Sequence, residues 1–67
     1  MIGTIVTLKI SKFFGFIAPD EDLGSDLFFF STSVSNRQFS ELHIGDAVEF
    51  TLEQHEKGLR ARDITVL

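Results

Sequence analysis

Aromatic side chains alternate in two short segments of the chain, at a spacing that would let flat apolar rings stack on other flat rings. One segment carries Phe14 and Phe16, and the other carries Phe28 and Phe30. Successive residues of a β-strand point to opposite faces, so each pair is expected on one face of its strand. If the two strands are neighbours, the four rings form one platform.

The chemistry expected of this platform is the stacking of nucleobases. Diagonal spacings of about 7–8 Å between neighbouring strands suit successive bases laid flat on successive rings. Each stacked base contributes roughly 1–3 kcal/mol, and stacking tolerates any sequence because every base has a π-face. The pattern therefore predicts a binding site for single-stranded RNA or DNA.

Not all of the phenylalanines belong to this platform. The chain has eight Phe and no Tyr or Trp, and a core this small does not easily hold eight rings. Phe29 and Phe50 fall in the inward register and are assigned to the core. Burial of the four platform rings is the alternative, and strand alternation favours their exposure. Phe13 fits equally well as a ring packed against a loop or as a binding residue.

The segments that must position these rings have the residue patterns of β-strands. Turn residues separate the strands, including an acidic loop at residues 19–26 and a hairpin turn at residues 56–58, where Gly58 supplies the positive φ. No segment has the periodicity of an α-helix. Five short strands predict an all-β fold, a small five-stranded antiparallel barrel that forms one domain over residues 1–67. The strands are expected at residues 2–10, 13–17, 27–31, 47–54 and 60–67.

Composition narrows the classes of function. The net charge is −4, so charge alone does not make this chain coat nucleic acid, and a local patch has to supply the attraction. There is no cysteine for a disulfide or a thiolate metal site. The apolar runs are far shorter than a membrane span, and the N-terminus lacks the layout of a signal peptide. We expect a soluble, cytoplasmic protein without a membrane partner.

Several segments resemble a known family, the bacterial cold-shock proteins and their cold-shock domain relatives. The family motifs Gly-Thr-Val-Lys-Trp-Phe-Asn, Lys-Gly-Phe-Gly-Phe-Ile and Asp-Val-Phe-Val-His-Phe-Ser correspond here to residues 3–9, 12–17 and 26–32. Residues 45–50 and 57–67 of the tail match as well, so the likeness covers essentially the whole chain. The resemblance implies an OB-fold barrel that binds single strands and acts as an RNA chaperone or a regulator of transcription or translation.

The resemblance also implies roles for individual residues. It assigns base stacking to Phe14, Phe16 and Phe28. Phe30 stands where the family has a stacking histidine, and Phe39 matches an aromatic of the long loop that covers one more base. Contacts with the nucleic-acid backbone are implied for Lys12 and Lys57. Lys9 and Arg60 are further candidates for phosphate contacts.

The chain departs from the family pattern at several positions around the platform. Thr7 replaces a tryptophan, and Ser31 replaces a further stacking phenylalanine. Val6, Leu8 and Phe13 replace a lysine, a phenylalanine and a glycine. The two missing rings are expected to weaken binding by roughly one to three orders of magnitude.

Other functions have less support in the residues. The acidic loop lacks the spacing and terminal Glu of a calcium loop, and His43 and His55 stand alone in turns. We therefore expect no enzyme activity, no cofactor, no metal and no small-molecule substrate. The alternative function is a protein-interaction or self-association module that uses the exposed Phe patch. We expect a monomer, or a weak or strand-swapped dimer.

Overall fold

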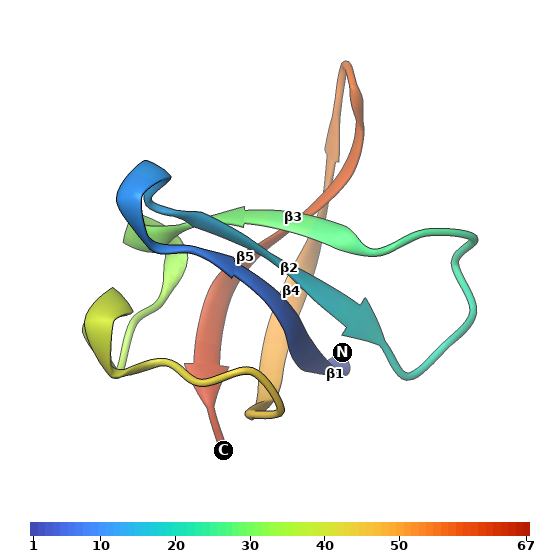
Figure 1. Ribbon diagram of the computed structural model, residues 1–67. Coiled ribbons are helices and arrows are strands. Elements are labelled where there is room, and N and C mark those ends of the chain that lie inside the picture. Colours follow the sequence, from blue (N-terminus) through green and yellow to red (C-terminus); the bar gives the residue numbers. More distant parts are fainter.

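Five strands close into a barrel in the computed structural model, which describes residues 1–67 (Figure 1). The strands are β1 (Ile2–Lys9), β2 (Phe14–Pro19), β3 (Leu27–Phe30), β4 (Ala47–His55) and β5 (Gly58–Val66). Around the barrel they follow the order β1-β2-β3-β5-β4. The prediction of a five-stranded all-β barrel is confirmed, and β1 ends one residue earlier than expected.

One pair of neighbouring strands runs in the same direction, although the sequence interpretation gave an antiparallel barrel. β3 and β5 are parallel, and the other four pairs are antiparallel. The reason is the odd number of strands, because directions cannot alternate all the way around a closed ring of five. The parallel pair is the place where the ring closes, and it brings Arg60 beside Phe28.

Short 3₁₀ turns connect the strands: η1 (Ile10–Lys12), η2 (Ser31–Ser33) and η3 (Phe39–Glu41). Phe13 follows η1 in the left-handed conformation, with φ 60°, so β2 begins at Phe14 and not at Phe13 as expected. Gly58 has φ 126°, as the hairpin turn requires. No helix has the length and apolar character that crossing a membrane requires.

Nine apolar residues fill the barrel. Phe29 and Phe50 are among them, with exposed fractions of 0% and 3%, which confirms their inward assignment. Gly15 faces the same interior, and a Cβ there would lie 2.5 Å from the Thr7 carbonyl oxygen and 2.9 Å from the Phe29 ring. The missing side chain lets β2 lie close to both. The core consists of Ile5, Ile17, Leu27, Phe29, Leu42, Val48, Phe50, Ala61 and Ile64.

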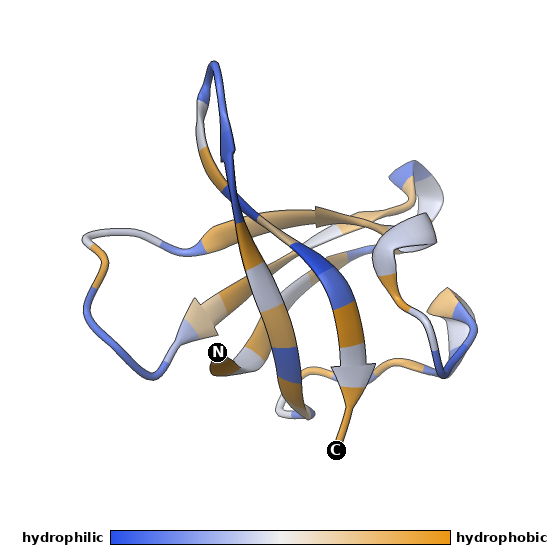
Figure 2. Cartoon of the chain, turned by 180° about the vertical axis from the view of Figure 1, so that it is seen from behind, coloured by the Kyte–Doolittle hydropathy of each residue, from blue (hydrophilic) through white to orange (hydrophobic).

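The β4–β5 hairpin extends beyond the barrel as an arm (Figure 1). Figure 2 shows that the tip of this arm is hydrophilic, whereas β3, which lies beside the base of the arm, is hydrophobic along its length. The acidic loop between β2 and β3 projects from another side of the barrel (Figure 1). An apolar strand therefore meets a polar arm at one place on the surface.

Candidate nucleic-acid interface

The four predicted rings lie on the outer face of two neighbouring strands. Phe14 is the register partner of Phe30, and Phe16 is the partner of Phe28, so the two pairs stand side by side. None of the four is buried, and Phe30 is the most open, with an exposed fraction of 47%. We call these four residues the Phe platform. Their predicted placement on one face is confirmed.

The rings of the Phe platform are packed against one another and do not form a flat floor. Neighbouring centroids lie 4.7–5.9 Å apart, closer than the sequence interpretation assumed. Phe14 and Phe28 are tilted by 31° from each other. Phe16 and Phe30 stand nearly perpendicular to Phe28, at 77° and 90°. Edge-to-face contacts of this kind follow from the quadrupole of the phenyl ring, so the platform offers separate ring faces to a ligand.

A β-bulge in β1 determines which of its side chains reach this surface. Ile5 pairs with Ile17, but the next pair in register is Thr7 with Phe16, so Val6 is an extra residue. The bulge reverses the alternation, and Thr7 and Lys9 therefore face outward although Ile5 faces the core. Thr7 lies beside Phe16 and leaves the β1 edge of the platform without a ring.

Lys9 follows Thr7 at the same edge of the platform. It is exposed and pairs in register with Phe14. Lys12 is exposed in η1, the turn that links Lys9 to the first ring of the platform. Both predicted cations therefore lie near the Phe14 end of the surface.

Arg60 borders the opposite edge of the platform. Its guanidinium carbon lies 5.5 Å from the centroid of Phe28 and 5.1 Å from that of Phe30, within the range of a cation–π contact. On its other side, the Arg60 Nε lies 3.7 Å from a carboxylate oxygen of Glu53, its register partner in β4. Nothing in the sequence indicates that Arg60 faces the rings, and the parallel pairing of β3 with β5 puts it there.

The hairpin arm and one side of the Phe platform border an open hollow of about 490 Å³. One wall consists of Phe28 and Phe30, and the other consists of His55, Lys57, Gly58, Leu59 and Arg60. The sequence interpretation included Lys57 but left out His55 and Leu59. Both lie two residues from Lys57, on either side of the hairpin turn, and this closeness in sequence could have indicated that they line the same site.

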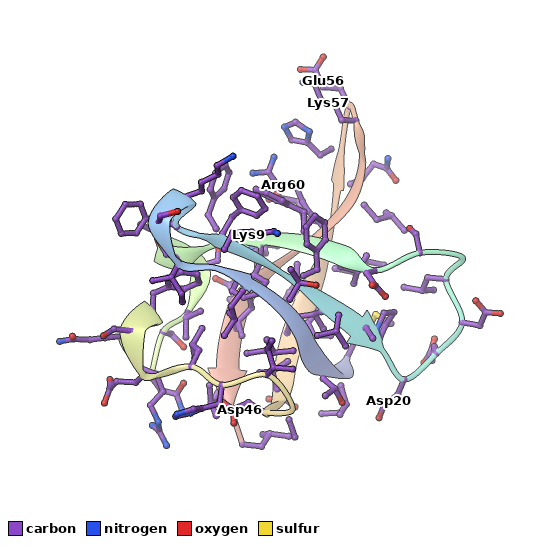
Figure 3. All side chains as sticks on the ribbon, viewed as in Figure 1. Lys9, Asp20, Asp46, Glu56, Lys57 and Arg60 are labelled. Atoms are coloured by element: carbon purple, nitrogen blue, oxygen red, sulfur yellow. The ribbon has the colours of Figure 1, made fainter.

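Charge is distributed unevenly around the molecule. In Figure 3, Lys9 and Arg60 lie where the arm meets the barrel and Lys57 lies at the tip of the arm beside Glu56, whereas Asp20 and Asp46 lie at the opposite end of the molecule. Lys9, Lys12, Lys57 and Arg60 are the cations on this side, and Glu53 and Glu56 are their acidic neighbours. The local charge of the interface is therefore more positive than the net charge of −4 suggests. No group of three or more His, Asp or Glu side chains is arranged to hold a metal.

Two further phenylalanines lie outside the platform. Phe39, predicted to cover one more base, is half-buried and packs against the core, with its ring centroid 6.3 Å from that of Phe29. It makes no ring contact with the platform, and its role in binding stays a prediction. Phe13 has an exposed fraction of 63% and makes no ring contact with another aromatic.

Residues 1–67 match the family described as "'Cold-shock' DNA-binding domain". The chain is 38% identical over 66 residues to the major cold shock protein of Micrococcus luteus, covering 98% of this chain and 97% of that protein. It is 34% identical over 67 residues to the cold shock-like protein CspG of Escherichia coli K12, covering 100% of this chain and 94% of that protein.

Among solved structures, Drosophila Unr CSD456 resembles the barrel with a TM-score of 0.78 and 38% sequence identity. The likeness covers 98% of this chain but 26% of that longer one. The closed barrel, the outward rings and the whole-length family match agree with one another. The chain belongs to the cold-shock domain family, whose members are OB-fold barrels that bind nucleic acids.

Proposed function

We propose that this chain binds single-stranded RNA or DNA by stacking nucleobases on the Phe platform, with low sequence specificity. In the cell it acts as an RNA chaperone or as a regulator of transcription or translation. The observation that carries the proposal is the packing of four partly exposed phenyl rings on one outward face, bordered by cationic side chains in a chain of net charge −4.

Bases would stack on individual ring faces of the platform. Phe14 and Phe28 share one approximate orientation, and the other two rings stand across it. Successive bases would therefore change tilt along the surface, which a flexible single strand allows and a stacked duplex does not. Lys9, Lys12 and Lys57 lie around the rings where they would neutralise phosphates.

Preferential binding to single strands gives the proposed activity its mechanism. A ligand that binds one of two states shifts the equilibrium toward that state without any other energy source. By holding unpaired bases, the protein would melt weak RNA hairpins or keep them from forming. Such melting would change the passage of a polymerase or a ribosome over the transcript.

Self-association through the same surface is the alternative use of the platform. The exposed Phe30 and Leu59 would favour it, because both offer apolar surface beside the hollow. Two copies meeting face to face, however, would bring Lys9, Lys57 and Arg60 of each molecule close together. Like charges at close range oppose that association, so a polyanion is the better partner for this surface.

Titration of fluorescently labelled heptathymidine or heptauridine, followed by anisotropy, tests the proposal. A label on the oligonucleotide is needed because the chain has no Trp or Tyr. The Phe16→Ala/Phe28→Ala double variant is expected to lose at least about tenfold in affinity. Phe13→Ala removes an exposed ring outside the platform and serves as the matched control, with affinity unchanged within about twofold.

Circular dichroism of each variant establishes that the barrel is intact. No binding by the parent chain, or equal losses in the double variant and the Phe13 control, would refute the proposal. Light scattering over a concentration series provides the second comparison. Dimerisation that the same double variant abolishes would favour self-association instead.

A further inference from the structure

Arg60 is held at the edge of the Phe platform by contacts on both sides of its side chain. The guanidinium lies over Phe28 and Phe30, and its Nε lies near Glu53. The side chain has an exposed fraction of 22%, lower than the 48% of Arg62, two residues further along the same strand. Figure 3 shows Arg60 on the arm between Lys57 at the tip and the rings of the barrel. The group is therefore confined to one position beside the hollow.

The hydrogen-bond donors of Arg60 are free within the protein. The 3.7 Å separation from Glu53 is too long for a hydrogen bond. Arg62, in contrast, donates a hydrogen bond of 2.8 Å to Asp63. The guanidinium thus presents N–H donors in one plane, and none of them is used within the protein. Such a group can bind a ligand that has two adjacent hydrogen-bond acceptors.

The surroundings of Arg60 favour a base over a phosphate as that ligand. Its guanidinium lies against ring faces, at the level where a stacked base would lie. Lys57 occupies the tip of the arm, and Lys9 lies beyond Phe14 at the other edge, so cations for the backbone already stand further out. A base on Phe28 or Phe30 would present an edge to the Arg60 fork.

We propose that Arg60 makes this hollow a guanine-preferring subsite; the inference rests on the proposed function and names its preferred base. Guanine carries two adjacent acceptors, O6 and N7, which an arginine fork binds bidentately. Because the Phe28 and Phe30 rings stand at 90° to each other, a base stacks on the face of one ring and meets the other ring at its edge. Adenine presents a donor next to its N7, so the same fork does not fit it.

A guanine scan of a thymidine heptamer tests this inference on the intact chain. One dG is placed at each position of dT7 in turn, and affinities are measured by anisotropy. We expect one position at which dG raises affinity about tenfold over dT7. Inosine at that position keeps O6 and N7 and retains the gain, whereas 7-deazaguanine lacks N7 and loses it.

Substitution at Arg60 separates the fork from the charge. Arg60→Lys keeps a cation but loses the planar fork, and it is expected to lower the ratio of the affinity for the dG-containing heptamer to the affinity for dT7. Arg62→Lys is the matched control on the same strand and retains the gain. Circular dichroism establishes that both variants are folded.

The outcomes distinguish this inference from the proposed function. Binding of dT7 with a flat dG scan, or a dG gain that Arg60→Lys leaves unchanged, would overturn guanine recognition and leave single-strand binding intact. Failure of every heptamer to bind would overturn both. A single dG-preferring position that depends on Arg60 and on N7 would support the inference.

Discussion

The two faces of β3 contain the same residue type in opposite environments. Phe29 is fully buried in the barrel, whereas Phe28 on one side of it is partly buried and Phe30 on the other has an exposed fraction of 47%. Alternation along the strand alone separates them. One run of phenylalanines therefore stabilises the fold with its inner face and forms the proposed binding surface with its outer face.

Truncation of the inner ring is expected to have the largest effect on stability. Phe29→Ala removes a ring with no exposed surface from a core of nine residues, and such changes cost about 3–5 kcal/mol. A domain of this size has a total stability of about 3–10 kcal/mol. The variant should therefore be largely unfolded or close to it at 25 °C, as measured by urea denaturation followed by circular dichroism.

Phe29→Leu provides the matched control for that prediction. It keeps an apolar side chain in the core and should lose less stability than Phe29→Ala, because the cavity left behind is smaller. If Phe29→Ala and Phe30→Ala destabilised the chain equally, the contrast between the two faces of β3 would be wrong.

A methyl group at Gly15 should disturb the same inner face from the neighbouring strand. The Cβ of Gly15→Ala would lie 2.5 Å from the Thr7 carbonyl oxygen and 2.9 Å from the Phe29 ring, so β1 and β2 must separate and the ring must shift as well. Overpacking of this kind costs about 1–3 kcal/mol. Urea denaturation measures the loss.

Gly24→Ala is the comparison for Gly15→Ala. The added methyl group meets nothing within 4 Å, but φ at Gly24 is 91°, so the loss should be limited to the backbone term of about 1 kcal/mol. A Gly15→Ala variant as stable as Gly24→Ala would mean that β2 does not lie close to β1 and Phe29.

Alternation explains how much of this structure the sequence could predict. It is a local property, so it correctly gave the inward Phe29 and Phe50 and the outward rings of the platform. Alternation does not reveal a change of register. The bulge at Val6 is an extra residue that alternation cannot anticipate, and it turns Thr7 and Lys9 outward.

Contacts between residues far apart in the chain could not be predicted from the sequence either. Arg60 lies beside Phe28 because β5 closes the barrel next to β3, a contact between residues 32 positions apart. Phe39 packs toward Phe29 in the same way, through tertiary contacts that the long loop does not reveal. The family resemblance supplied the fold and the candidate residues, but not these contacts.

Truncation of the outer ring is expected to act on binding more than on folding. Phe30→Ala removes the most exposed ring of the platform and should weaken binding of heptathymidine by about 5-fold to 100-fold. Stability should fall by only about 1 kcal/mol, because the ring makes an edge-to-face contact with Phe28 and a cation–π contact with Arg60. Anisotropy and urea denaturation measure the two losses separately.

Phe30→His tests whether a flat ring is what this position contributes. The resemblance places a histidine here in the family, and an imidazole keeps a stacking surface. The variant should bind within about threefold of the parent chain. A loss as large as that of Phe30→Ala would show that hydrophobic area, and not stacking, is the contribution of Phe30.

The smallest expected effect comes from the charge beside the platform. Glu53 lies 3.7 Å from Arg60 and 3.6 Å from Arg62, at partly exposed positions where such pairs contribute about 0–1 kcal/mol to stability. Glu53→Gln should therefore change stability little. It also removes the carboxylate nearest to Arg60, so anionic oligonucleotides should bind about two to three times more tightly.

Glu49→Gln is the matched control. It removes the same charge further along β4, where Glu49 pairs with Thr65 rather than with an arginine. Equal gains in both variants, measured by anisotropy at the same ionic strength, would mean that net charge alone governs affinity and that Glu53 has no special relation to the rings.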